Sequence, residues 1–77
     1  MQWEVVIGAN VRRLRLAKGL TQEALAHECD IDMRYLGGIE RGQENPTVAV
    51  IGAIAAALGV NPTVLWAPET DAPSLKP

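Results

Sequence analysis

Apolar residues recur at helical spacing along this chain, and the first such run lies near its start. Ile7, Val11 and Leu14 are separated by four and three positions, so they share one face of a helix. The pattern predicts a helix over 4–18. Gly19 follows it and is the residue type that most often ends a helix in a left-handed conformation.

The segment 21–42 predicts two short helices joined by a tight turn. Thr21 and Asp32 each carry an oxygen that can accept a hydrogen bond from an unpaired amide in a first helical turn. Between the helices, Asp30 tolerates the left-handed conformation of a sharp turn, and Gly42 is placed to end the second helix in the same way. This is the outline of a helix-turn-helix, so DNA is the leading partner.

Each of these two helices has an apolar face and a polar face. Leu25 and Ala26 are expected to face inward from the first helix, and Leu36 and Ile39 from the second. The opposite stripe of the second helix carries Arg34, Gly37, Gly38 and Arg41, with Met33 beside it. This stripe is the candidate surface for contact with a partner.

Two further helices are predicted after a polar loop over 42–46. Thr47 can cap a helix that runs to Leu58 and closes at Gly59. The predicted core face of this helix comprises Val48, Ile51, Ile54, Ala55 and Leu58. A short fifth helix is expected over 61–66, with Pro62 in its first turn.

An ordered set of residues at these spacings resembles a known family. The set comprises Ile7, Val11, Leu14-Arg15, Gly19-Leu20-Thr21-Gln22, Gly38-Ile39-Glu40-Arg41-Gly42, Asn45-Pro46-Thr47 and Ala57-Leu58-Gly59-Val60. In these residues the chain resembles the phage-repressor and Cro type of helix-turn-helix protein, the XRE family. The resemblance implies an all-α, five-helix lambda-repressor-like domain over 1–66, with the helix-turn-helix at helices two and three. A flexible Pro-rich tail is expected over 67–77.

The resemblance also implies a function and several residue roles. The protein is expected to be a sequence-specific transcriptional regulator that binds double-stranded DNA as a homodimer, on a pseudo-palindromic operator. In the family, the second helix of the helix-turn-helix enters the DNA groove and is called the reading helix here. The residue matching Gln22 touches a phosphate and braces this helix, while those matching Arg41 and Asn45 anchor phosphates. The family's arginine and glutamate at Arg15 and Glu40 pair across helices one and three.

Three residues of the reading helix have alternative interpretations. Arg34 could pair with O6 and N7 of guanine, or instead contact a phosphate or solvent. Met33 could pack on a thymine methyl group or between helices. Tyr35 is expected to pack inward, with its hydroxyl able to reach the DNA backbone.

Gly37 and Gly38 are unusual because each costs about 1 kcal/mol relative to alanine in a helix interior. Two explanations are open: close approach of the helix to the floor of the DNA groove, or tight packing against a neighbouring helix. Gly37 also departs from the family, which more often has serine there, so it removes a side chain that could read a base.

The overall charge opposes the DNA interpretation. The net charge is -2 and the sequence pI is about 5.2, whereas DNA-binding domains are usually basic. Basic residues nevertheless gather at Arg12, Arg13, Arg15 and Lys18, while Glu44, Glu69 and Asp71 can lie elsewhere. The alternative is a protein-interaction module, antitoxin-like or an adaptor, with the same fold and little DNA affinity.

The length limits the core and favours self-association. A domain of 77 residues with 4% aromatic residues has a thin core, so a dimer would add stability. Val64, Leu65 and Trp66 form the candidate dimer interface, because they are apolar and close to the end of the domain.

The sequence gives little support for catalysis, metal or cofactor binding. His27 and Cys29 are the single histidine and the single cysteine, so a closed zinc site would need further ligands, and a buried cysteine beside a polar histidine is the expectation. There is no phosphate-binding loop or nucleophile motif. The protein is therefore expected not to be an enzyme. The absence of a signal peptide or long apolar span predicts a cytoplasmic protein with no membrane partner.

Overall fold

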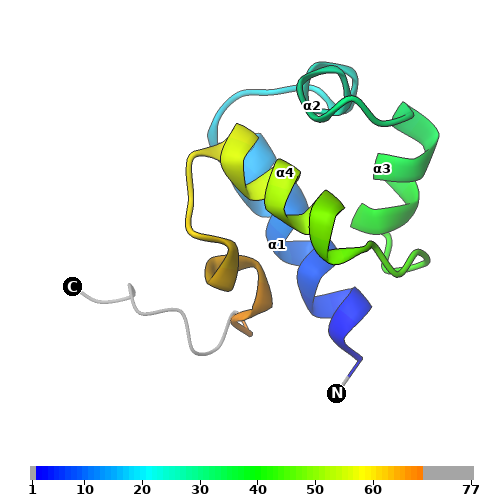
Figure 1. Ribbon diagram of the computed structural model, residues 1–77, viewed down its shortest axis with the longest axis vertical. Coiled ribbons are helices and arrows are strands. Elements are labelled where there is room, and N and C mark those ends of the chain that lie inside the picture. Colours follow the sequence, from blue (N-terminus) through cyan, green and yellow to red (C-terminus); the bar gives the residue numbers. More distant parts are fainter. Residues whose placement is uncertain (1, 69–77) are drawn as a thin grey trace.

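The computed structural model describes residues 2–68, and this part of the chain is entirely helical (Figure 1). Its elements are α1 (Trp3–Ala17), α2 (Gln22–Cys29), α3 (Met33–Glu40), α4 (Val48–Leu58) and the 3-10 helix η1 (Pro62–Trp66). The predicted all-α fold is confirmed. The fifth helix is the one difference in type, because its five residues form a 3-10 helix instead of an α-helix.

The helix boundaries follow the capping residues. The hydroxyl of Thr21 accepts a hydrogen bond from the Ala24 amide at 3.0 Å, and the carboxylate of Asp32 accepts one from the Arg34 amide at 2.7 Å. Asp30 has a φ of 58°, and it is the only non-glycine residue with positive φ in the described range. The turn predicted between the two short helices is therefore confirmed, together with its backbone conformation.

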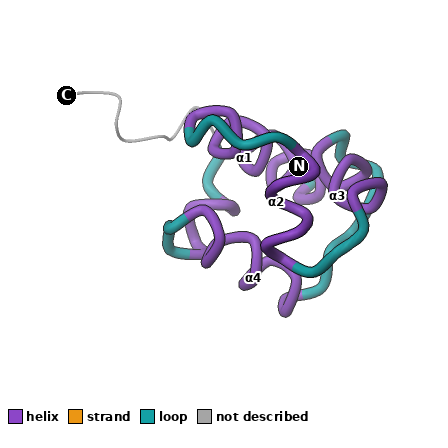
Figure 2. The backbone as a smooth tube through the Cα atoms, turned by 90° about the horizontal axis from the view of Figure 1, so that it is seen from above, coloured by secondary structure: helices purple, strands orange, loops and turns teal. Residues whose placement is uncertain are grey.

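The helices pack around a single apolar core. α1 lies behind α4 in Figure 1, while α2 and α3 occupy one end of the molecule and η1 lies against α1 and α4. Figure 2, turned by 90°, shows α1 at the top of the view, α4 at the bottom and α3 at the right. The core comprises Ile7, Val11, Leu25, Ala26, Cys29, Leu36, Ile39, Ile51, Ile54, Ala55, Leu58 and Leu65.

One residue of the predicted core is exposed. Val48 shares a helical stripe with Ile51 and Leu58, but 83% of its surface is accessible. It is the first residue of α4, directly after the cap Thr47, where the helix has not yet reached the core. Helical spacing correctly placed the other members of the stripe and was wrong for Val48.

α1 packs closely against α3 at Gly8, a residue that sequence reasoning did not single out. A Cβ built on Gly8 would lie 2.1 Å from the carbonyl oxygen of Ile39 and 3.0 Å from that of Glu40. Since real Cβ atoms do not come this close to backbone atoms, only glycine permits this packing of α1 against α3.

A buried asparagine fastens η1 to α1. The side-chain amide of Asn10 donates to the carbonyl oxygens of Leu65 at 2.9 Å and Ala67 at 2.8 Å, and it lies 3.4 Å from that of Val64. Its own carbonyl oxygen accepts from Nη2 of Arg13 at 2.9 Å. These bonds satisfy the end of η1 and hold Leu65 in the core.

The structure describes only the first two residues of the tail predicted over 67–77. Ala67 and Pro68 follow η1 and are half-buried. The rest of the segment for which flexibility was predicted, 69–77, lies outside the described residues.

Candidate nucleic-acid interface

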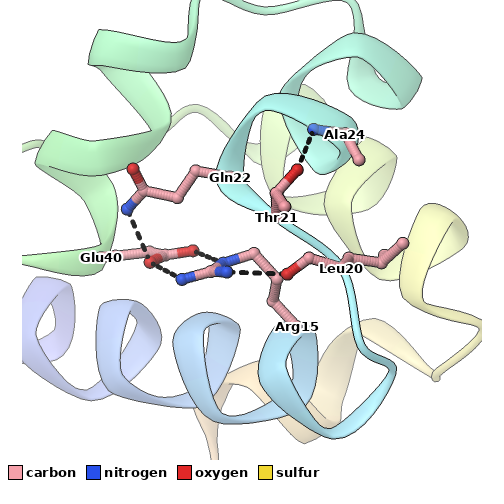
Figure 3. A network of polar contacts seen from close by, with 6 residues as sticks. All are labelled: Arg15, Leu20, Thr21, Gln22, Ala24 and Glu40. Carbon is pink, nitrogen blue, oxygen red and sulfur yellow. Dashed lines mark hydrogen bonds and ion pairs between the residues drawn. The ribbon is translucent and has the colours of Figure 1, made fainter.

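A buried ion pair fixes α3 to α1. Nε of Arg15 lies 2.7 Å from Oε2 of Glu40, and Nη2 of Arg15 donates to Oε1 at 3.0 Å (Figure 3). The two side chains are only 8% and 2% exposed. The hydrogen bonds to Glu40 raise the pKa of Arg15 against the opposing effect of burial. The pairing of these two residues, implied by the family resemblance, is confirmed.

The same network reaches α2 and the loop before it. Nη1 of Arg15 donates to the carbonyl oxygen of Leu20 at 2.8 Å, and Nε2 of Gln22 donates to Oε1 of Glu40 at 3.0 Å (Figure 3). Gln22 therefore braces α3 through Glu40, as expected. Its second expected role, contact with a phosphate, remains a prediction. Because α1 and α2 both donate hydrogen bonds to the Glu40 carboxylate, the orientation of α3 is set by buried polar bonds as well as by apolar packing.

The first turn of α3 projects into solvent. Met33 is 47% exposed and Arg34 is also exposed, whereas Tyr35 is half-buried and packs against the core. This exposure disfavours packing of Met33 between helices. Both Met33 and Arg34 are therefore free to meet a partner, while Tyr35 has the inward packing expected for its ring.

The two glycines of α3 lie on the outward stripe, yet both are buried. A Cβ on Gly37 would lie 3.1 Å from Nη1 of Arg41 and 3.7 Å from Oε1 of Gln22. A Cβ on Gly38 would lie 2.7 Å from Cγ and 3.3 Å from Oε2 of Glu44. The glycines thus lie on the predicted stripe, but the side chains of neighbouring residues cover them. The nearest atoms at both positions belong to side chains, not to the backbone of a neighbouring helix.

Glu44 is the residue at this face that sequence reasoning missed. The sequence allowed it to lie away from the basic residues. Its side chain rests on Gly38, and Arg41 covers the adjacent Gly37. The available signal was Gly38 itself, because a glycine on a helix surface leaves space that a nearby long side chain can fill. The outward face of α3 thus carries a cation and a carboxylate supplied from beyond its last residue.

The remaining polar candidates lie around the end of α3. Nε of Arg41 donates to Oε1 of Gln43 at 3.1 Å, and Asn45 is exposed in the following loop. Arg12 and Arg13 are exposed on α1. Phosphate contacts by these side chains remain predictions.

The candidate dimer residues differ in exposure. Leu65 is completely buried in the core of its own chain, so its predicted place in a surface patch is wrong. Val64 is half-buried, and Trp66 is 39% exposed. Trp66 instead has an aromatic neighbour on α1: its ring centroid lies 5.8 Å from that of Trp3, which is 45% exposed.

Cys29 is buried and His27 is exposed, as expected. Burial raises the pKa of the Cys29 thiol, and the nearby Glu28 carboxylate raises it further. Within residues 2–68, no three His, Cys, Asp or Glu side chains are grouped so as to hold a metal ion. None of the described helices has the length and apolar character needed to cross a membrane.

Comparison with known proteins identifies related sequences over most of the chain. Residues 11–65 match the model of the helix-turn-helix family HTH_3. The chain is 40% identical over 73 residues to the uncharacterized HTH-type transcriptional regulator y4dJ of Sinorhizobium fredii, with 95% of each protein covered. It is 44% identical over 59 residues to the control protein C.BamHI of Bacillus amyloliquefaciens, which covers 75% of this chain and 73% of that protein.

Solved structures agree with the sequence comparison. The crystal structure of the restriction-modification controller protein C.AhdI from Aeromonas hydrophila superposes with a TM-score of 0.78 at 45% identity, covering 80% of this chain and 94% of that one. The hypothetical transcription factor NHTF from Neisseria gives a TM-score of 0.86 at 36% identity, covering 90% and 79%.

Proposed function

The chain belongs to the helix-turn-helix family HTH_3, and from this premise we propose that it regulates transcription as a homodimer on a pseudo-palindromic operator. Two copies would insert their α3 helices into adjacent major grooves about 34–36 Å apart. Its DNA target would place this action in the cytoplasm. The similarity to control and controller proteins supports control of a nearby promoter, including its own.

The observation that carries this proposal is the exposed first turn of α3. Arg34 stands at the N-terminal end of the reading helix, where helix-turn-helix proteins contact base edges. Behind it, Glu40 at the other end of the same helix is fixed by Arg15 and Gln22. An exposed arginine on a rigidly held helix is suited to bidentate recognition of guanine.

Binding to the DNA upstream of the gene tests this proposal directly. The purified protein is titrated against that duplex and against unrelated duplex at two salt concentrations, by fluorescence anisotropy. We expect Arg34→Ala to weaken binding to the upstream duplex about tenfold, because a bidentate base contact is lost. Binding to the unrelated duplex should weaken much less.

Arg12→Ala is the matched control for this experiment. It removes one positive charge from an exposed arginine on α1 and leaves α3 unchanged. It should affect both duplexes by a similar factor, because phosphate contacts carry no sequence information. Equal and feeble binding of the wild type to sequences from a random duplex pool would contradict the regulator proposal and favour a protein-interaction module.

The proposed homodimer rests on the exposed aromatic pair formed by Trp3 and Trp66 together with half-buried Val64. Aromatic side chains are enriched at interface centres, and a patch near a two-fold axis can meet its own copy. We expect Trp66→Ala to raise the dimer dissociation constant at least tenfold in analytical ultracentrifugation.

Leu16→Ala provides the control for the dimer experiment. Leu16 is 50% exposed and lies on α1 at the opposite end from Trp3, so its truncation removes exposed apolar surface elsewhere. The dissociation constant of this variant should stay that of the wild type. A Trp66→Ala protein that remains dimeric at nanomolar concentration would refute the proposed interface.

A further inference from the structure

The middle of the reading helix offers none of its own side chains to DNA. Gly37 and Gly38 occupy the positions that follow Met33 and Arg34 by one helical turn on the outward stripe. The side chains that cover these glycines come from Arg41 and Glu44, which lie beyond the last residue of α3, and from Gln22 of α2. The side chains that this part of the helix presents to a groove are therefore supplied by other segments, and Glu44 provides the carboxylate among them.

The placement of Glu44 is determined by the missing side chain at Gly38. Its Cγ lies 2.7 Å from the point where a Cβ of residue 38 would stand, so any other residue there would displace it. Its Oε2 lies 3.3 Å from the same point, which puts the carboxylate against the outward face of the helix. Glu44 is exposed, so the carboxylate is accessible from outside.

We propose that Glu44 is a specificity-determining residue that selects cytosine at one position of each half-site. This inference rests on the proposed DNA-binding function and names a residue outside the expected contact set. A carboxylate only accepts hydrogen bonds, and the N4 amino group of cytosine is a donor in the major groove.

The other bases fit this carboxylate less well. Guanine presents acceptors at N7 and O6, and thymine presents an acceptor at O4, so both repel a negative charge. Adenine has a donor at N6, but its N7 acceptor lies beside it. Cytosine alone offers a donor on its own edge without an adjacent acceptor.

Arg41 makes the approach of a carboxylate to DNA feasible. Its guanidinium covers the adjacent Gly37, so a positive charge lies on the same face as Glu44. The positive charge of Arg41 offsets the repulsion between Glu44 and the phosphates. At a sequence without a hydrogen-bond donor opposite Glu44, the carboxylate gains no hydrogen bond and still repels the DNA. Glu44 thereby lowers affinity for incorrect sequences more than for the operator.

Selection from a random duplex library tests the role of Glu44. The wild type, Glu44→Gln and Gly38→Ala are each used to enrich bound duplexes, which are then sequenced. Glu44→Gln keeps the side-chain shape but adds an amide donor, so it should accept bases with acceptor edges. Gly38→Ala leaves Glu44 intact but forces its side chain away from the helix face.

Both variants should lose preference for cytosine at the same position, by about fivefold to tenfold, with the rest of the motif retained. Gly37→Ala is the matched control, because the new Cβ meets Arg41 and leaves the contact of Glu44 intact. The Gly37→Ala variant should retain the preference for cytosine at that position. Thermal unfolding of each variant confirms that it is folded.

The outcomes separate failure of this inference from failure of the proposed function. A symmetric wild-type motif that is unchanged in Glu44→Gln would overturn the role of Glu44 and leave the regulator proposal standing. If Glu44→Gln strengthened binding to all sequences equally, the role of Glu44 would also be overturned, because the carboxylate would then repel every DNA sequence alike. A wild type that enriches no motif would overturn both proposals.

Discussion

Two buried glycines, Gly8 and Gly38, show how differently the two faces of α3 are built. At Gly8 the neighbouring atoms are backbone carbonyl oxygens of Ile39 and Glu40, on the inner side of α3. At Gly38 the neighbouring atoms belong to the flexible side chain of Glu44, on the outer side. The inner contact cannot yield without separating two helices, whereas the outer contact can yield by rotation of one side chain. Burial alone does not distinguish a fixed position from an adaptable one.

Gly8→Ala tests the rigid side and should have the largest effect. The added Cβ would lie 2.1 Å from the carbonyl oxygen of Ile39, so α1 must shift away from α3. We expect the free energy of unfolding to fall by about 3 kcal/mol, as for strong overpacking of a core. Urea denaturation measures this loss.

Gly52→Ala is the control, because this glycine is also inside a helix but has open space around its Cβ position. It should stabilise the protein by up to about 1 kcal/mol through helix propensity. A Gly8→Ala variant as stable as the wild type would show that the α1–α3 contact can relax.

Glu40→Gln addresses the polar part of the same junction. The substitution keeps the shape of the side chain but leaves the buried Arg15 without its counter-charge. We expect a loss of about 2 kcal/mol in urea denaturation, since a buried charge loses its partner while some hydrogen bonds persist. Glu44→Gln, an exposed change of the same chemistry, should alter stability by less than about 0.5 kcal/mol. Equal stability losses for the two variants would contradict the contrast between the two faces.

Gly37→Ala tests the adaptable side, and its effect on stability should be smaller than those of Gly8→Ala and Glu40→Gln and opposite in sign. The atom in its way is Nη1 of Arg41, at the far end of a flexible side chain. We expect the unfolding free energy to rise by up to about 1 kcal/mol, because alanine is the better helix former. A loss of more than 1 kcal/mol in the same urea assay would mean that this face is as rigid as the inner one.

The sequence was sufficient for those parts of the fold that depend on local chemistry. The caps at Thr21 and Asp32, the left-handed turn at Asp30 and the inward stripe of α3 were predictable, because each depends on residues within one helical turn. The pairing of Arg15 with Glu40 came from the family resemblance, since 25 residues separate them in the chain.

The features that were missed or wrongly predicted depend on contacts between residues far apart in the chain. Gly8 and Asn10 were missed because their partners, on α3 and around the end of η1, become neighbours only after folding. Leu65 was assigned to the surface because an apolar residue near a chain end does not by itself reveal which side it faces. The position of Glu44 could not be predicted, because a loop residue has no helical periodicity from which its direction can be inferred.

α1 connects the proposed dimer surface of the protein to the reading helix α3. Asn10 bonds it to the end of η1, beside the aromatic pair, and Arg15 bonds it to α3. In the proposed dimer, α1 sets the distance between the two reading helices. The dimer therefore requires a defined length of DNA between the half-sites. One extra base pair there turns a half-site by about 35° around the DNA axis. Because the distance between its two reading helices is fixed, the dimer has little freedom to follow that rotation.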